Sequence, residues 1–298
     1  MNARLASWML ALLCAAGAAQ AENVTLKHGD LTLNANLEAA QENWQEGPVL
    51  LVTHGTLGHS GMEIIATLQS LFAEQGISSL APTLSLGLDD RRGMYDCAVP
   101  HAHKHTDALD EIGLWRDWLK VQGVQEIVLV GHSRGGNQTA WFAAERPEPA
   151  VRGVVLIAPA TWSEAYAEAD YRKRYSTDLA TVLTRAQKLV ESGKGETWVE
   201  KTGFLYCADA KVQAQSFVSY YTPDQRLDTP SLLADIEVPV LVFAGSADDV
   251  VPDVAEKVEP MADGQRIRLE VIDGADHFFR DLYADEVVEA TRAFIDAL

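Results

Sequence analysis

The sequence predicts an α/β fold in which a mostly parallel sheet is covered by helices on both faces. Short, continuous apolar runs such as residues 48–53 alternate along the chain with stretches of helical spacing. Such uniformly apolar strands are typical of a parallel sheet that is buried on both sides. The chain has 298 residues, 47% of them hydrophobic, which is enough to bury this core in one domain.

The individual elements can be assigned in chain order. Residues 24–40 alternate around His28-Gly29-Asp30, a pattern typical of two strands joined by a tight turn. Six further strands are expected at residues 48–53, 77–82, 126–130, 151–158, 238–244 and 266–272. Helices are expected at residues 60–75, 106–121, 134–145 and 284–298. The sheet should therefore contain eight strands.

Two segments depart from this alternation. Residues 84–105 form a long loop after a strand, and residues 160–237 form a polar, helix-favouring insertion. Both leave the carboxyl ends of predicted strands, where parallel α/β sheets carry their sites. We therefore expect the insertion to be a helical cap and both segments to surround the mouth of a pocket.

The first 21 residues have the pattern of a Sec-type signal peptide. Arg4 supplies a positive charge, residues 5–17 are apolar, and Ala19-Gln20-Ala21 matches a small-x-small cleavage site. The apolar run is short for a membrane span, and the small residues expected before a lipidated cysteine are missing before Cys14. The expected product is a mature domain of residues 22–298, periplasmic or extracellular.

Charge and cysteine content limit the partners. The formal net charge of −19 disfavours nucleic acid and anionic membranes, which attract clustered Lys and Arg. No second apolar stretch approaches membrane-spanning length, and the oligomeric state is left open. Outside the signal segment Cys97 and Cys207 remain. They are a candidate disulfide in an oxidising compartment, the alternative being two buried thiols.

A nucleophile motif follows the apolar run of residues 126–130. Gly131-His132-Ser133-Arg134-Gly135 matches G-x-S-x-G between a predicted strand and a predicted helix. A nucleophilic serine there needs a sharp, strained turn, and the residues two before and two after it crowd together, which favours glycine at both positions. The alternative is a glycine-rich turn without chemistry.

The serine also needs a base and an acid that orients the base. His277 is the only histidine after Ser133, and it follows the strand predicted at residues 266–272. The alternative for His277 is a surface loop residue. Asp248 and Asp249 follow the preceding strand, and two adjacent side chains cannot both address one imidazole. We choose Asp248.

These residues together resemble the α/β-hydrolase superfamily over essentially the whole mature chain. The matching segments are His54-Gly55-Thr56, Gly131 to Gly136, Gly245-Ser246-Ala247-Asp248 with Val251-Pro252, and Gly274-Ala275-Asp276-His277. The resemblance implies that Asp248 is the acid and that the backbone N–H groups of Thr56 and Arg134 form the oxyanion hole. The run of three glycines that one lipase branch has after its histidine is missing after His54.

The other histidines have less direct interpretations. His54 and His132 occupy motif positions where the side chain packs under the loops, so neither is a good base candidate. His101, His103 and His105 alternate in one segment and could bind a metal, contact substrate or belong to a polar loop. The triad requires neither metal nor cofactor, and none is expected.

Two further groups of residues could contact a substrate. Arg91 and Arg92 could grip an anionic or hydroxyl-rich molecule, or could hold their loop through ion pairs. The aromatic side chains of residues 160–237 could line an apolar pocket, or could simply seat the cap on the sheet.

The chemistry implied by the triad is acyl transfer to water on a small-molecule substrate. Hydrolysis of a carboxylic ester is the default, and cleavage of a small peptide or amide is the alternative. A function of a different class would be a binding protein that keeps the fold without turnover. No motif in the sequence identifies the substrate.

Overall fold

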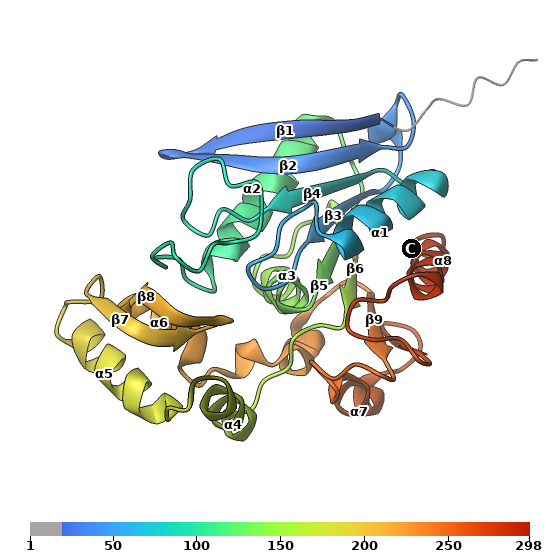
Figure 1. The fold of residues 1–298 in the computed structure, drawn as a ribbon. Coiled ribbons are helices and arrows are strands. Elements are labelled where there is room, and N and C mark those ends of the chain that lie inside the picture. Colours follow the sequence, from blue (N-terminus) through green and yellow to red (C-terminus); the bar gives the residue numbers. More distant parts are fainter. Residues whose placement is uncertain (1–19) are drawn as a thin grey trace, which may run out of the picture.

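An eight-stranded sheet forms the centre of the computed structural model, which describes residues 20–298 (Figure 1). Its strand order is β1-β2-β4-β3-β5-β6-β9-β10. The strands are β1 (Gln20–His28), β2 (Leu31–Ala39), β3 (Val49–Thr53), β4 (Ser79–Thr83), β5 (Ile127–His132), β6 (Val151–Ile157), β9 (Val240–Gly245) and β10 (Ile267–Ile272). The expected signal segment lies outside the described residues, apart from residues 20 and 21 at the start of β1.

The sheet is mostly parallel, as the apolar runs predict. β1 and β2 form an antiparallel hairpin in which His28 faces Leu31, and β2 also pairs antiparallel with β4. From β4 to β10 all neighbours run parallel. Every residue of β3, β4 and β5 is buried, which explains why these strands lack polar alternation.

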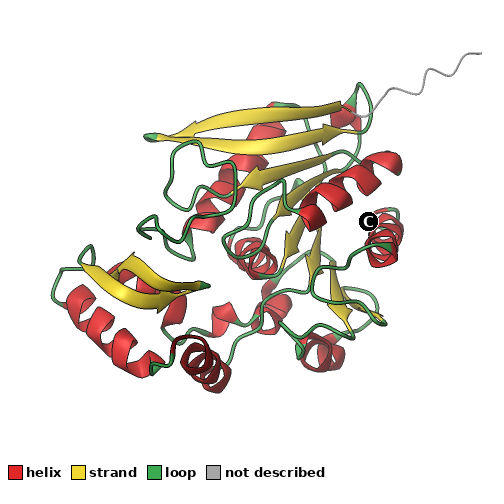
Figure 2. Ribbon diagram, viewed as in Figure 1, coloured by secondary structure: helices red, strands yellow, loops and turns green. Residues whose placement is uncertain are grey.

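Helices cover both faces of the sheet (Figure 2). Helices α1 and α8 contact each other and strands β2, β4 and β9, while α2 and α3 contact each other and strands β3, β5 and β6. Their bounds are α1 (Glu63–Glu74), α2 (Asp107–Val121), α3 (Arg134–Glu145), α7 (Val254–Val258) and α8 (Leu282–Ile295), with short 3-10 turns at Trp44–Glu46 and Glu259–Met261. Trp115 and Phe142 are fully buried between the helices and the sheet, and each such burial stabilises the fold by about 1.5–3 kcal/mol.

A cap is inserted between β6 and β9, where the polar segment predicts one (Figure 1). Its elements are α4 (Glu164–Tyr175), α5 (Leu179–Glu191), β7 (Trp198–Phe204), β8 (Cys207–Gln213), α6 (Ala214–Tyr221) and two 3-10 turns at Gln225–Leu227 and Thr229–Asp235. The sequence does not predict the β7–β8 hairpin, because charged residues such as Glu200 and Lys211 favour a helix locally. Val199 and Val212 face each other across the hairpin and are buried.

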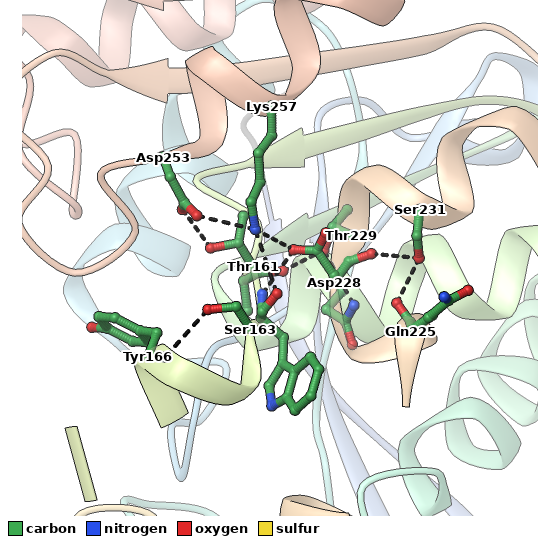
Figure 3. A network of polar contacts seen from close by, with 12 residues as sticks. Thr161, Ser163, Tyr166, Gln225, Asp228, Thr229, Ser231, Asp253 and Lys257 are labelled. Carbon is green, nitrogen blue, oxygen red and sulfur yellow. Dashed lines mark hydrogen bonds and ion pairs between the residues drawn. The ribbon is translucent and has the colours of Figure 1, made fainter. Parts of the chain in front are cut away.

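The two ends of the cap are joined to the body by a polar network (Figure 3). Asp228 Oδ1 accepts hydrogen bonds from the Trp162 amide, at 2.8 Å, and from Lys257 Nζ, also at 2.8 Å. Lys257 also pairs with Asp253 at 3.1 Å, and Asp253 accepts a 2.6 Å hydrogen bond from the Thr161 hydroxyl. The outgoing and returning segments of the cap are thereby held to α7 and to each other.

The loop of residues 84–105 lies against the cap. Its His101 amide donates to the Lys211 carbonyl, and the His101 carbonyl accepts from the Gln213 amide, so the loop adds a bridge to β8. Cys97 and Cys207 form a disulfide with their Cα atoms 5.4 Å apart. The candidate pairing is confirmed, and the cap is covalently joined to a segment 110 residues earlier.

None of the helices within residues 20–298 has the length and apolar character needed to cross a membrane.

Candidate active site

Ser133 lies at the sharp turn between β5 and α3. Its backbone has φ 57° and ψ −126°, a conformation that non-glycine residues adopt only under strain. A Cβ atom on Gly131 would lie 2.5 Å from the Gly135 carbonyl oxygen, and one on Gly135 would lie 2.6 Å from the Thr53 carbonyl oxygen. Both glycines are therefore required for the turn to close.

Three side chains from separate strand ends form one hydrogen-bonded chain. His277 Nε2 lies 2.9 Å from Ser133 Oγ, and His277 Nδ1 lies 2.8 Å from Asp248 Oδ2. The other carboxylate oxygen of Asp248 accepts hydrogen bonds from the amides of Val250 and Val251. Asp248 and His277 are buried. This is the spatial arrangement that a nucleophile, a base and an orienting acid require.

The environment of Asp248 favours its charged form. Burial alone would raise the pKa of this carboxyl group. The hydrogen bonds from His277 and from the Val251 and Val250 amides outweigh burial and hold the pKa below its ordinary value. Asp249, the alternative acid, has an exposed side chain.

His54 and His132 both lie beside the triad and both are buried. The Leu84 amide donates to His54 Nε2, and His54 Nδ1 donates to the Gly55 carbonyl. Burial and the charge of Arg91 lower the pKa of His54 to about 3. These contacts hold the loop after β3 and leave His54 no free nitrogen to act as a base.

The loop after β3 and the first turn of α3 border the pocket at Ser133. Thr56 and Arg134 line this pocket together with Ser133. Within residues 20–298, neither the Thr56 amide nor the Arg134 amide donates a hydrogen bond to the protein. Both N–H groups are thus free to donate to a substrate oxygen.

The pocket has a volume of about 150 Å³ and is walled largely by aromatic side chains of the cap. Several of their hydroxyl groups already have partners on the β7–β8 hairpin. Tyr171 donates to the Gly203 carbonyl at 2.9 Å, Tyr175 donates to the Leu205 carbonyl, and Tyr221 accepts from the Leu205 amide. These side chains therefore offer the pocket their rings. Phe204 and Phe217 belong instead to the buried core of the cap.

The three alternate histidines lie behind the pocket wall. His101 Nδ1 is 3.2 Å from His103 Nε2, and His103 Nδ1 is 2.8 Å from the Tyr220 hydroxyl. His105 Nε2 donates to Asn137 Oδ1 at 3.0 Å. Burial lowers the pKa of His101 to about 4 and the pKa values of His103 and His105 to about 3. The histidines are neutral supports for Tyr220 and Asn137, which line the pocket.

None of these histidines lines the pocket itself. Among the residues that the structure describes, no group of three or more His, Cys, Asp or Glu side chains is placed to hold a metal ion.

Arg91 likewise does not reach the pocket. Its buried guanidinium donates to the carbonyls of Leu84, Gly58 and Gly93, and so joins the loop after β3 to the loop of residues 84–105.

The sequence does not predict one feature of the site. The motif assigns Arg134 only a backbone role, but its side chain also contacts Thr56 and Tyr220, two other residues that line the pocket. No local signal identifies this role, because the position after the nucleophile varies freely within the motif.

Comparison with known proteins agrees with this architecture. Residues 49–290 match the model of the alpha/beta hydrolase family. Est1E from Butyrivibrio proteoclasticus is 19% identical, with a TM-score of 0.62, and the match covers 92% of this chain and 97% of that one. The esterase domain from a Rhodothermus marinus protein is 19% identical, with a TM-score of 0.59 and coverage of 92% and 97%.

E-2-(acetamidomethylene)succinate hydrolase is 20% identical, with a TM-score of 0.58 and coverage of 93% of this chain and all of that one (100%). At these identities the likeness shows the fold alone. No curated protein matches the chain. The chain belongs to the alpha/beta hydrolase family, and it is a hydrolase.

Proposed function

We propose that this hydrolase is an exported enzyme that cleaves a carboxylic ester through an acyl-enzyme on Ser133. The observation that carries the proposal is the hydrogen-bonded chain from Ser133 through His277 to Asp248, which opens on a pocket. A serine hydroxyl becomes an effective nucleophile only with such a base beside it.

The reaction begins with proton transfer. His277 Nε2 takes the Ser133 proton as Oγ attacks the ester carbonyl carbon, and Asp248 stabilises the imidazolium that forms. His277 then gives this proton to the leaving alcohol. A water molecule, activated in turn by His277, attacks the acyl-enzyme and releases the carboxylic acid and the free serine.

Charge that develops on the carbonyl oxygen needs donors in place before the reaction. The amides of Thr56 and Arg134 serve this purpose, since each lines the pocket beside Ser133 and has no acceptor within the described protein. One such donor lowers the barrier by about 3–4 kcal/mol.

Two observations support the finer parts of the proposal. One structural neighbour is the esterase domain of a Rhodothermus marinus protein, which favours an ester over an amide. The signal pattern of residues 1–21 and the Cys97–Cys207 disulfide both favour export, because disulfides persist in oxidising compartments.

Labelling with a fluorophosphonate probe tests the mechanism. Intact mass should show one adduct on the wild-type protein and none on the Ser133→Ala variant. Folded wild-type protein that takes no label would contradict the catalytic role of Ser133. Rates on p-nitrophenyl esters of increasing acyl length, beside aminoacyl anilides, then separate esterase from amidase activity. An amino terminus at Glu22 in the exported protein would support the cleavage site.

A further inference from the structure

Arg134 lines the pocket, and two neighbouring side chains fix its guanidinium. Its Nε donates a 2.9 Å hydrogen bond to the Thr56 hydroxyl, and its Cζ lies 5.4 Å from the centre of the Tyr220 ring. Tyr220 is in turn held by the hydrogen bond between its hydroxyl group and His103. The side chain is half-buried, and its conformation is set by neighbours on two sides.

The two terminal nitrogens of this guanidinium have no protein partner. Within residues 20–298, no carboxylate forms an ion pair with Arg134, and its one side-chain hydrogen bond is made by Nε. Nη1 and Nη2 are therefore both free to donate. A half-buried cation without a counter-ion is unusual, because removing charge from water costs free energy unless a partner compensates.

The remaining charges of the pocket lining do not supply that partner. Arg174 pairs with Asp170 at 2.6 Å, and the Arg174 guanidinium lies over the Tyr206 ring. These two charges compensate each other and leave Arg134 uncompensated. Among the residues that line the pocket, one positive charge is therefore left without a partner, in a chain whose net charge is −19. An unpaired cation of this kind attracts an anion.

We propose that Arg134 determines specificity by binding a carboxylate on the substrate, so that the enzyme prefers anionic esters such as the half-esters of short dicarboxylic acids. The free edge of a guanidinium matches the two oxygens of a carboxylate. The contacts with Thr56 and Tyr220 already restrict the side chain, so binding costs little further rotamer entropy. The pocket volume of about 150 Å³ favours a short acid, since a cavity of about this size holds one benzene ring.

This inference rests on the proposed esterase function. A competing role for Arg134 is to position Thr56, whose hydroxyl it binds. The two roles differ in what they do to charged and neutral substrates. Loss of a carboxylate partner weakens binding of anionic esters alone, whereas displacement of Thr56 slows every ester by the same factor.

A matched pair of substrates provides the test. The p-nitrophenyl half-ester of glutaric acid carries a carboxylate, and its methyl ester has nearly the same shape without the charge. Wild-type enzyme should have the higher kcat/KM on the half-ester. Arg134→Gln should reduce this preference about ten- to a hundredfold, mostly through KM, as expected for a hydrogen-bonded charge pair. Arg134→Lys, which keeps the charge without the planar fork, should retain part of the preference.

Arg152→Gln is the matched control. It removes the same charge from an exposed residue near the amino end of β6, at the opposite edge of the sheet from Ser133, and should leave the preference unchanged. Two outcomes would overturn the proposal: a wild-type enzyme with no preference for the half-ester, or an Arg134→Gln variant that slows both esters equally.

Binding of glutarate separates this inference from the proposed function. Calorimetry on Ser133→Ala protein should detect glutarate, and the added Arg134→Gln change should abolish the heat. This measurement requires no turnover. Binding without ester hydrolysis by the wild-type enzyme would contradict the esterase function and support the Arg134 site. Hydrolysis without glutarate binding would contradict the Arg134 site and leave the esterase function intact.

Discussion

His132 Nε2 lies 2.9 Å from the carbonyl oxygen of His277, so the residue before Ser133 holds the backbone of His277. Burial, followed by repulsion from His277, lowers the pKa of His132 to about 4. His132 is therefore neutral at pH 7. Its Nε2 must carry the hydrogen, because a carbonyl oxygen only accepts.

This contact predicts a positioning role for His132. His132→Phe fills most of the space but cannot donate, and we expect kcat to fall about tenfold with little change in KM, as about 1.4 kcal/mol of transition-state stabilisation is lost. His132→Gln, whose amide can donate, should recover part of the rate. Steady-state kinetics on one p-nitrophenyl ester measure both. Equal kcat values for wild-type and His132→Phe enzyme would contradict this positioning role of His132.

The two adjacent acids should differ sharply in importance. Asp248→Asn replaces the acceptor that holds His277 Nδ1–H, and by analogy with other triads kcat should fall about 10⁴-fold. Asp249→Asn changes an exposed side chain and should keep kcat within about twofold. Single-turnover labelling by a fluorophosphonate gives the same comparison without a substrate preference. If Asp249→Asn lowered kcat more than Asp248→Asn did, Asp249 would be the orienting acid.

Loss of the disulfide should weaken the fold. The Cys97–Cys207 bond closes a loop of 110 residues, and its removal by Cys97→Ser with Cys207→Ser should lower the free energy of unfolding by about 2–4 kcal/mol. Urea unfolding with and without reductant measures this loss in the wild-type protein. The double variant serves as the control, because reductant should have no further effect on it. If reductant left the free energy of unfolding of the wild-type protein unchanged, the disulfide would not contribute to its stability.

Acid should unfold the protein through its buried histidines. The pKa values of His54, His101, His103, His105 and His132 are all lowered by burial from 6.5 to about 3 or 4. Below pH 6.5 the unfolded chain therefore binds more protons than the folded one, and stability falls as the pH falls toward 4. Urea midpoints measured from neutral to acidic pH should drop steeply over this window. A flat profile would indicate that these side chains do not stay neutral.

Glu111 should act in the opposite direction. Burial raises its pKa to about 7, although Ser85 donates to it from both amide and hydroxyl groups. The folded state thus favours the protonated form, and this group lowers stability as the pH rises from 4.5 through 7. Glu111→Gln keeps acceptor and donor positions and should stabilise the protein at pH 8 by about 1–3 kcal/mol. The gain should shrink as the pH falls and vanish below pH 4.5, and a gain independent of pH would contradict this origin.

The parts of the fold that follow from sequence depend on local patterns. The apolar run before Ser133 and the glycines around it specify a buried strand and a closed turn, because both depend on neighbours within a few residues. Local patterns of this kind do not predict the β7–β8 hairpin. Its buried positions, among them Val199 and Val212, become apolar partners only when the two strands meet, while the charged residues between them favour a helix locally.

The sequence by itself identified the candidate residues Ser133, Asp248 and His277 and their order along the chain, since each follows the end of a recognisable strand. Only the tertiary structure decided how the pocket is built. Arg134 meets Tyr220, and Cys97 meets Cys207, across long stretches of chain. No local pattern encodes such contacts, because they arise only once the cap has packed onto the carboxyl edge of the sheet. For the same reason, the charge of the pocket wall is a property of the folded enzyme.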